Sequence, residues 1–273
     1  MPPKTKEKTG GTTSEPVSTS GQDTSGTSGK SSSPLLGTGK LPLEEAVPKT
    51  FKGKLGTTHE VLVTVAQKCT AEVKDKFKKW EESIAIFPEA PHPPETGMTQ
   101  DVMMAILLGH AGFMGPHGPE DTTGADVLHA FEVQLDSLKI YAILQMKVEK
   151  FELKVAGAPN LKEPTVDWTY ESGGARNLQM DLIQKTMLNK DIHVLGGYIV
   201  FSLKGITFVP IEDVIEEYKK HKTDLTANKE DGKRKMTKAL MGKHETEPNF
   251  IDAIIKHADP TFHVTKGVAA TKI

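Results

Sequence analysis

The spacing of apolar residues predicts several amphipathic helices. Cys69, Val73, Phe77 and Trp80 follow one another at intervals of four, four and three residues, which places them on one helix face with lysines opposite. The same periodicity predicts further helices at 98–110, at 178–187 and, after Pro210, near 211–222, 234–242 and 248–257.

Runs of β-branched residues predict strands elsewhere. His59–Ala66 (HEVLVTVA) is one such run. Residues 193–209 (HVLGGYIVFSLKGITFV) predict two or three short strands, with turns at Gly196-Gly197 and Lys204-Gly205. Shorter strand candidates lie at 147–155 and 164–170.

Proline and glycine mark the connections between these elements. Residues 87–97 (FPEAPHPPETG) and 109–124 (GHAGFMGPHGPEDTTG) are rich in one or both and are predicted loops. Thr99 is the predicted cap of the helix that follows the first loop, with Asp101 in its first turn. Residues 127–138, after the second loop, are compatible with a helix.

The first 40 residues differ in amino-acid composition from the rest of the chain. They hold 16 Ser or Thr, seven Gly and five Lys, with Leu35 and Leu36 as their main apolar content. Such a segment buries too little apolar surface to offset the loss of chain entropy, so we expect a disordered tail over 1–45. The tail serves either as a solubilising segment or as a phosphorylation platform.

The predicted elements together indicate an α+β fold. We expect one compact domain over 46–273, with a short-stranded antiparallel sheet and a helical C-terminal third. A domain of this length can bury a full hydrophobic core.

Composition narrows the classes of function. The formal net charge is −2, and only two of the 34 basic residues are arginines, Arg176 and Arg234, which disfavours sequence-specific reading of DNA. Cys69 is the single cysteine, so no internal disulfide is expected. The first residues lack the apolar core of a secretory signal, which favours a cytosolic or nuclear protein that is not secreted.

The candidate chemical groups do not form an active site. His110, His117 and His129 lack the spacing of metal ligands and are interpreted as loop histidines. The glycines of 109–118 do not match a phosphate-binding loop, and Cys69 on an apolar helix face is expected to be a packed thiol. The glycines of 171–177 are interpreted as a tight turn rather than an anion site. We therefore expect no enzyme, with no catalytic residue, no metal and no cofactor.

Two basic clusters near the C-terminus have the form of a bipartite nuclear import signal. Lys219-Lys220 and Lys233-Arg234-Lys235 are separated by the twelve residues HKTDLTANKEDG. Two acidic troughs on an import carrier would accept the two clusters while the spacer, rich in polar and loop-forming residues, leaves both exposed. The alternative is that the clusters are solvated helix ends.

The assembled features resemble the matrix proteins of plant rhabdoviruses that replicate in the nucleus. The resemblance rests on the Ser/Thr/Lys-rich segment 1–40, the α+β domain with its 193–209 strands, the two basic clusters and the lack of a catalytic motif. It implies a self-associating structural protein of the virion and host nucleus, associated with membrane. The implied partners are a second copy of the chain, the nucleocapsid protein, a membrane surface or glycoprotein tail, and a nuclear import carrier, with no small-molecule substrate.

Two other classes stay open. One is a viral nucleocapsid or phosphoprotein-like cofactor, which would need a lysine-lined groove or a coiled-coil segment; no sustained heptads are found. The other is a nuclear adaptor protein without enzymatic activity, which would share the tail and the import signal but would stay monomeric in low salt.

Overall fold

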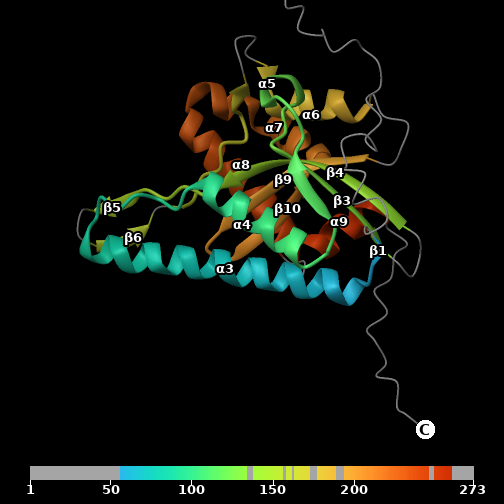
Figure 1. Ribbon diagram of the computed structural model, residues 1–273. Coiled ribbons are helices and arrows are strands. Elements are labelled where there is room, and N and C mark those ends of the chain that lie inside the picture. Colours follow the sequence, from blue (N-terminus) through green and yellow to red (C-terminus); the bar gives the residue numbers. More distant parts are fainter. Residues whose placement is uncertain are drawn as a thin grey trace, which may run out of the picture. The chain divides into compact units, whose positions relative to one another are not determined.

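A mixed β-sheet organises the domain (Figure 1). The computed structural model describes residues 56–133, 138–155, 158–161, 163–172, 177–188, 194–245 and 249–259. Within these residues the sheet has six strands in the order β1-β3-β4-β9-β10, with β2 also paired to β3. Their bounds are β1 (Gly56–Thr57), β2 (Phe113–Pro116), β3 (Val127–Val133), β4 (Leu138–Val148), β9 (Val194–Ser202) and β10 (Gly205–Pro210).

Strands β4 and β9 form the parallel centre of the sheet. Tyr141 pairs with Val194 and Val148 with Phe201, so eight residues of each strand are in register. The neighbouring pairs β3–β4 and β9–β10 are antiparallel, whereas β1 pairs with β3 in parallel. The expected single α+β domain with a helical C-terminal part is confirmed. The sheet, expected to be antiparallel and short-stranded, is mixed: most of its pairs are antiparallel, but β4 is 11 residues long and runs parallel to β9.

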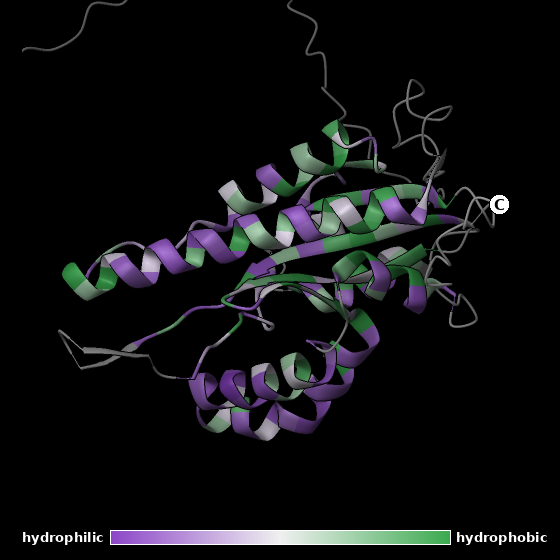
Figure 2. Cartoon of the chain, turned by 90° about the horizontal axis from the view of Figure 1, so that it is seen from below, coloured by the Kyte–Doolittle hydropathy of each residue, from purple (hydrophilic) through white to green (hydrophobic). Residues whose placement is uncertain are grey.

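Helices cover both faces of the sheet and create two hydrophobic cores. Ile199 and Phe201 of β9 pack into the core under α3, α4 and α9, while Tyr198 and Val200 pack into the core with α6, α7 and α8. This alternation follows from the two-residue period of a strand. Figure 2 shows the sheet between the long helix α3 and the largely polar helical layer opposite. The helices are α3 (His59–Ile86), α4 (Glu95–Leu108), α5 (Glu120–Thr123), α6 (Gln179–Leu188), α7 (Ile211–Ala227), α8 (Lys229–His244) and α9 (Phe250–Ala258).

The strand predicted at His59–Ala66 is wrong, because this segment forms the first two turns of α3. Thr58 caps the helix by accepting a hydrogen bond from the Val61 N–H. Leu62, Val65 and Ala66 are buried and continue the apolar face that the sequence predicted for residues 69–80. The helical spacing of the buried side chains therefore outweighs the strand preference of the β-branched residues.

The helix considered for 127–138 is also wrong. Residues 127–133 form β3, in which every side chain except Glu132 is buried. A strand buried on both faces gives a nearly continuous apolar run, which periodicity does not distinguish from a buried helix. The loop predicted at 109–124 contains two elements that its glycines and prolines concealed, namely β2 and the short helix α5.

Gly196 and Gly197 lie inside β9 and do not form the predicted turn. A Cβ on Gly196 would lie 2.2 Å from the Met187 sulfur, and one on Gly197 would lie 2.4 Å from the Phe208 ring. The two glycines therefore leave room for Met187 of α6 on one face of the strand and for the Phe208 ring of β10 on the other. The turn predicted at Lys204-Gly205 is confirmed, and Gly205 has a φ of 118° that favours glycine.

The remaining strand predictions hold only in part. The candidate at 147–155 is broken, because β4 ends at Val148 and β5 begins at Leu153. Within 164–170 only Thr165 makes a bridge, to Lys150. The outlying strands form two ribbons: β5 (Leu153–Val155) with β6 (Ala158–Leu161), and β7 (Glu171–Ser172) with β8 (Asn177–Leu178).

The helix predictions are mostly confirmed, with shifted ends. The helices predicted near 211–222, 234–242 and 248–257 correspond to α7, α8 and α9. The helix predicted at 98–110 begins earlier, at Glu95, so Thr99 is not its cap and instead donates a hydrogen bond to the Glu95 carbonyl. The predicted tail, 1–45, lies outside the described residues.

A buried hydroxyl connects α8 to the segment before β7. The Thr237 hydroxyl accepts hydrogen bonds from the Val166 N–H and the Trp168 ring N–H, both at 3.0 Å. We predict that Thr237→Val lowers the free energy of unfolding by about 2–4 kcal/mol, because two buried donors lose their acceptor. Urea denaturation measures this loss.

Thr237→Ser is the matched control, because it keeps the hydroxyl and removes one methyl group, at a cost of about 1 kcal/mol. A Thr237→Val protein as stable as the wild type would contradict the role given to this hydroxyl.

Candidate functional site

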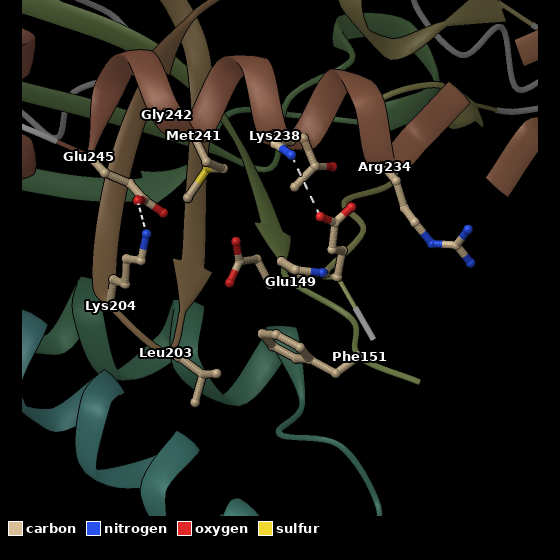
Figure 3. A pocket seen from close by; sticks show the side chains of 12 residues that line it. Glu149, Phe151, Leu203, Lys204, Arg234, Lys238, Met241, Gly242 and Glu245 are labelled. Carbon is tan, nitrogen blue, oxygen red and sulfur yellow. Dashed lines mark hydrogen bonds and ion pairs between the residues drawn. The ribbon is translucent and has the colours of Figure 1, made fainter. Parts of the chain in front are cut away.

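A cavity of about 390 Å³ opens beside α8, at the end of β4 (Figure 3). Its volume lies in the range of small-molecule pockets. Phe151, Leu203 and Met241 supply much of its apolar wall. The polar groups of the lining are carried by Glu149, Glu163, Lys204, Arg234, Thr237, Lys238 and Glu245.

Three parts of the fold position this lining. Glu149 is the first residue after β4, and its backbone N–H donates to the Phe201 carbonyl of β9. Leu203 and Lys204 form the turn between β9 and β10. The side of α8 that carries Thr237, Lys238 and Met241 lies above the cavity in Figure 3, and Gly242 on that helix leaves open space where a side chain would be.

Most of the charged groups around the cavity are paired with one another. Lys204 forms an ion pair with Glu245, and Lys238 lies 3.6 Å from Glu163. Arg234 lies 3.7 Å from Glu152 and points away from the cavity in Figure 3. These pairs neutralise the rim.

Glu149 is the exception. Its side chain is directed into the cavity in Figure 3, the residue is only 4% exposed, and no ion pair joins it to a cation of the described chain. Burial, and to a smaller extent the nearby Glu245 carboxylate, raises the pKa of Glu149 to about 7, although Lys204 and the Leu203 N–H oppose the shift. Glu149 therefore changes charge near neutral pH.

The two predicted basic clusters lie on neighbouring helices. Lys219 and Lys220 are on α7, and Lys233, Arg234 and Lys235 are on α8. Acidic neighbours pair with four of the five: Lys220 with Glu216 and Glu217, Lys233 with Asp167 and Glu230, Arg234 with Glu152, and Lys235 with Asp224 and Asp231.

The spacer between the clusters is folded, contrary to the expectation of an open linker. It comprises the end of α7, the single residue Asn228 and the start of α8. Asn228 caps α8 by accepting from the Asp231 N–H, and Gly232 fits tightly against Leu225 of α7. A carrier that needs both clusters extended must therefore open this helical hairpin.

The other groups that the sequence singled out lie apart from the cavity. Cys69 is packed in the core as expected, and burial raises the pKa of its thiol to about 12. His129 is a residue of β3 and not a loop histidine; its complete burial lowers its pKa to about 3. Among the described residues, no cluster of His, Cys, Asp and Glu suits a metal ion, and no helix is long and apolar enough to cross a membrane.

Sequence reasoning missed the cavity. Glu149 lies within KVEKFELKV, where its alternation with apolar residues is typical of a strand. The end of β4 at Val148 removes it from the strand and turns it toward α8. A comparison of the chain with models of known protein families and with curated proteins found no significant match.

The raised pKa of Glu149 predicts a pH-dependent stability. The pKa of the Glu149 carboxyl is higher in the folded protein than its ordinary value of 4.5, so folding favours the protonated form. The free energy of unfolding therefore falls as pH rises from about 4.5 to about 7. We predict that Glu149→Gln is more stable than the wild type by about 3 kcal/mol near pH 8, and that the difference vanishes near pH 4.5. Denaturant unfolding across this pH range measures it.

The control for this prediction is Glu163→Gln, which removes an exposed carboxylate from the same rim. Its stability relative to the wild type should stay nearly constant between these pH values. A constant difference for Glu149→Gln as well would contradict the raised pKa.

The import signal remains a prediction with a direct test. Replacing Lys233, Arg234 and Lys235 together by Gln should leave a large fluorescent fusion in the cytoplasm, because one of the two basic clusters is lost. Imaging in plant cells measures the nuclear fraction.

A matched variant carries Gln at Lys229, Lys238 and Lys243, which lie on the same helix and outside the two clusters. It changes the charge equally and should still accumulate in the nucleus. Equal nuclear accumulation of both variants would rule out this signal.

Proposed function

We propose that this chain is a self-associating structural protein of the viral matrix type, without enzymatic activity. The observation that carries the proposal is the exposure of large apolar side chains on α3 and α4. Of the six such side chains exposed in the described residues, five belong to these helices or directly follow them: Val61, Ile86, Phe87, Met104 and Leu108.

The first apolar patch, called the tip patch, consists of Ile86 and Phe87. They are 71% and 68% exposed and lie where α3 ends. In Figure 2 this end of the long helix extends past the sheet. Two large apolar side chains at a projecting helix end suit insertion into another surface.

The second patch, called the flank patch, consists of Met104 and Leu108. They lie one helical turn apart on α4 and are 51% and 70% exposed. The opposite side of α4 buries Met98, Val102 and Ile106, so the second half of the helix, residues 102–108, is apolar on every side, whereas its first turns carry polar residues such as Asp101. A helix of this kind is usually covered on every side, which makes a second surface over the flank patch favourable.

The two patches are well separated on one molecule. Leu108 precedes Gly109, which lies against Val65 near the start of α3, whereas the tip patch lies 21 residues further along the same helix. At 1.5 Å per residue this is about 30 Å. A tip patch seated on the flank patch of the next copy is a head-to-tail contact, which leaves one tip and one flank patch free on every pair and so does not stop at a dimer.

Association that does not stop at a dimer is one property that a layer-forming protein needs. The resemblance to nucleorhabdovirus matrix proteins supports the further roles proposed here: condensing the nucleocapsid, linking it to the membrane or the glycoprotein tail, and passing through the host nucleus. The Ser/Thr/Lys-rich residues 1–40 are proposed to make further contacts with these partners.

Complementary variants test the head-to-tail contact. Phe87→Ser removes the main tip side chain and Leu108→Ser the main flank side chain, and each should weaken association about ten- to hundredfold. In sedimentation velocity at low salt the wild type should form large species and each variant alone should stay small. An equimolar mixture should form a discrete pair, because only one intact tip and one intact flank can meet.

Tyr170→Ser is the control, since Tyr170 is exposed but lies outside both patches. It should assemble like the wild type. A monomeric wild type, or a mixture that polymerises as fully as the wild type, would contradict the proposal.

A further inference from the structure

The cavity beside α8 has one buried acid and an apolar wall, and its rim charges are already paired. At its inner end two carboxylates, Glu149 and Glu245, face the single ammonium group of Lys204. When Glu149 is ionised, this end carries one uncompensated negative charge. A buried charge is stable when it is paired, so a cationic group of a ligand would neutralise the remaining negative charge at this end of the cavity.

The rest of the cavity specifies the body of that ligand. Phe151 on one side and Met241 on the other present apolar surface, and Leu203 in the β9–β10 turn adds to it. Phe151 is also held by a ring cluster, since its ring lies 5.8 Å from that of Trp80 and 6.2 Å from that of His92. The apolar wall is therefore fixed before a ligand arrives.

We propose that this cavity binds a small hydrophobic amine, with the ammonium group paired to Glu149 and the apolar body between Phe151 and Met241. A free small molecule fits the geometry better than a lysine side chain of another protein. The carboxylate lies deep, and a volume of about 390 Å³ exceeds what one lysine stem fills. The ligand is bound and not transformed, so the site adds a binding function to a structural protein.

The probe set is 4-phenylbutylamine with two matched compounds, 4-phenylbutan-1-ol and 4-phenylbutanoic acid. Calorimetric titration of the full-length chain near pH 8 should give binding of the amine at least about tenfold tighter than that of the alcohol, because only the amine carries the compensating charge. The acid should bind more weakly than either, since a second carboxylate would face Glu149 and Glu245.

The pH dependence gives a second readout. The amine stays protonated throughout, whereas Glu149 ionises with a pKa of about 7, so amine affinity should rise about tenfold from pH 6 to pH 8. The other charged groups of the lining are Glu163, Lys204, Arg234, Lys238 and Glu245. The alcohol carries no charge and should bind almost equally at both values.

Two variants distinguish the contribution of the Glu149 carboxylate to binding from that of the cavity space. Glu149→Gln should abolish both the preference for the amine and its pH dependence while keeping alcohol binding. Gly242→Phe should abolish binding of both compounds, because a side chain there enters open space in the lining. Gly242→Ala should bind both compounds like the wild type and report that substitution of this glycine is tolerated by the fold.

The proposal is overturned if the wild type binds amine and alcohol equally, or if Glu149→Gln retains the amine preference. It is also overturned if the peptide acetyl-Ala-Lys-Ala-amide binds as tightly as the amine, which would assign the site to a lysine side chain. Because Phe87→Ser and Leu108→Ser leave the cavity intact, amine binding by these variants separates this inference from the proposed self-association.

Discussion

Burial of the β4–β9 pair on both faces is the constraint on which the rest of the structure depends. Every residue of β4 from Ile140 to Val148 is buried, and the side chains of neighbouring β9 residues pack into opposite cores. Two helical layers are needed to cover such a pair. Because the strands are parallel, the chain must also cross from the end of β4 back to the start of β9. The first residue of that crossing is Glu149, so the sheet topology places this residue at the end of β4, where the chain leaves the sheet.

The two helical layers differ in the surface that they offer. On α7 and α8, lysines pair with acidic neighbours within and between the helices, as Lys235 does with Asp224 and Asp231. Such exposed pairs contribute little to stability but leave a polar, nearly neutral surface. At the end of α3 and on α4 the exposed residues include Phe87 and Leu108, which are apolar. The layer that carries apolar side chains outward is the one suited to contact a second copy.

Apart from His59–Ala66, where β-branched residues indicated a strand, the elements that bury one face were predicted well from the sequence. The spacing of Cys69, Val73, Phe77 and Trp80 identified the buried side of α3 correctly, and the C-terminal helices were found for the same reason. Prediction failed where burial is two-sided, as in β3, and where glycines serve close packing, as at Gly196. It missed Glu149 as well, because a carboxyl becomes unusual only when tertiary structure removes it from water.

The most direct test of the head-to-tail account is electron cryomicroscopy of the protein assembled at low salt. The account predicts an open array in which the Ile86–Phe87 end of one copy lies on the Met104–Leu108 side of the next, with every copy related to its neighbour in the same way. Closed dimers joined through two equivalent α4 surfaces, or assemblies in which both patches face solvent, would contradict it.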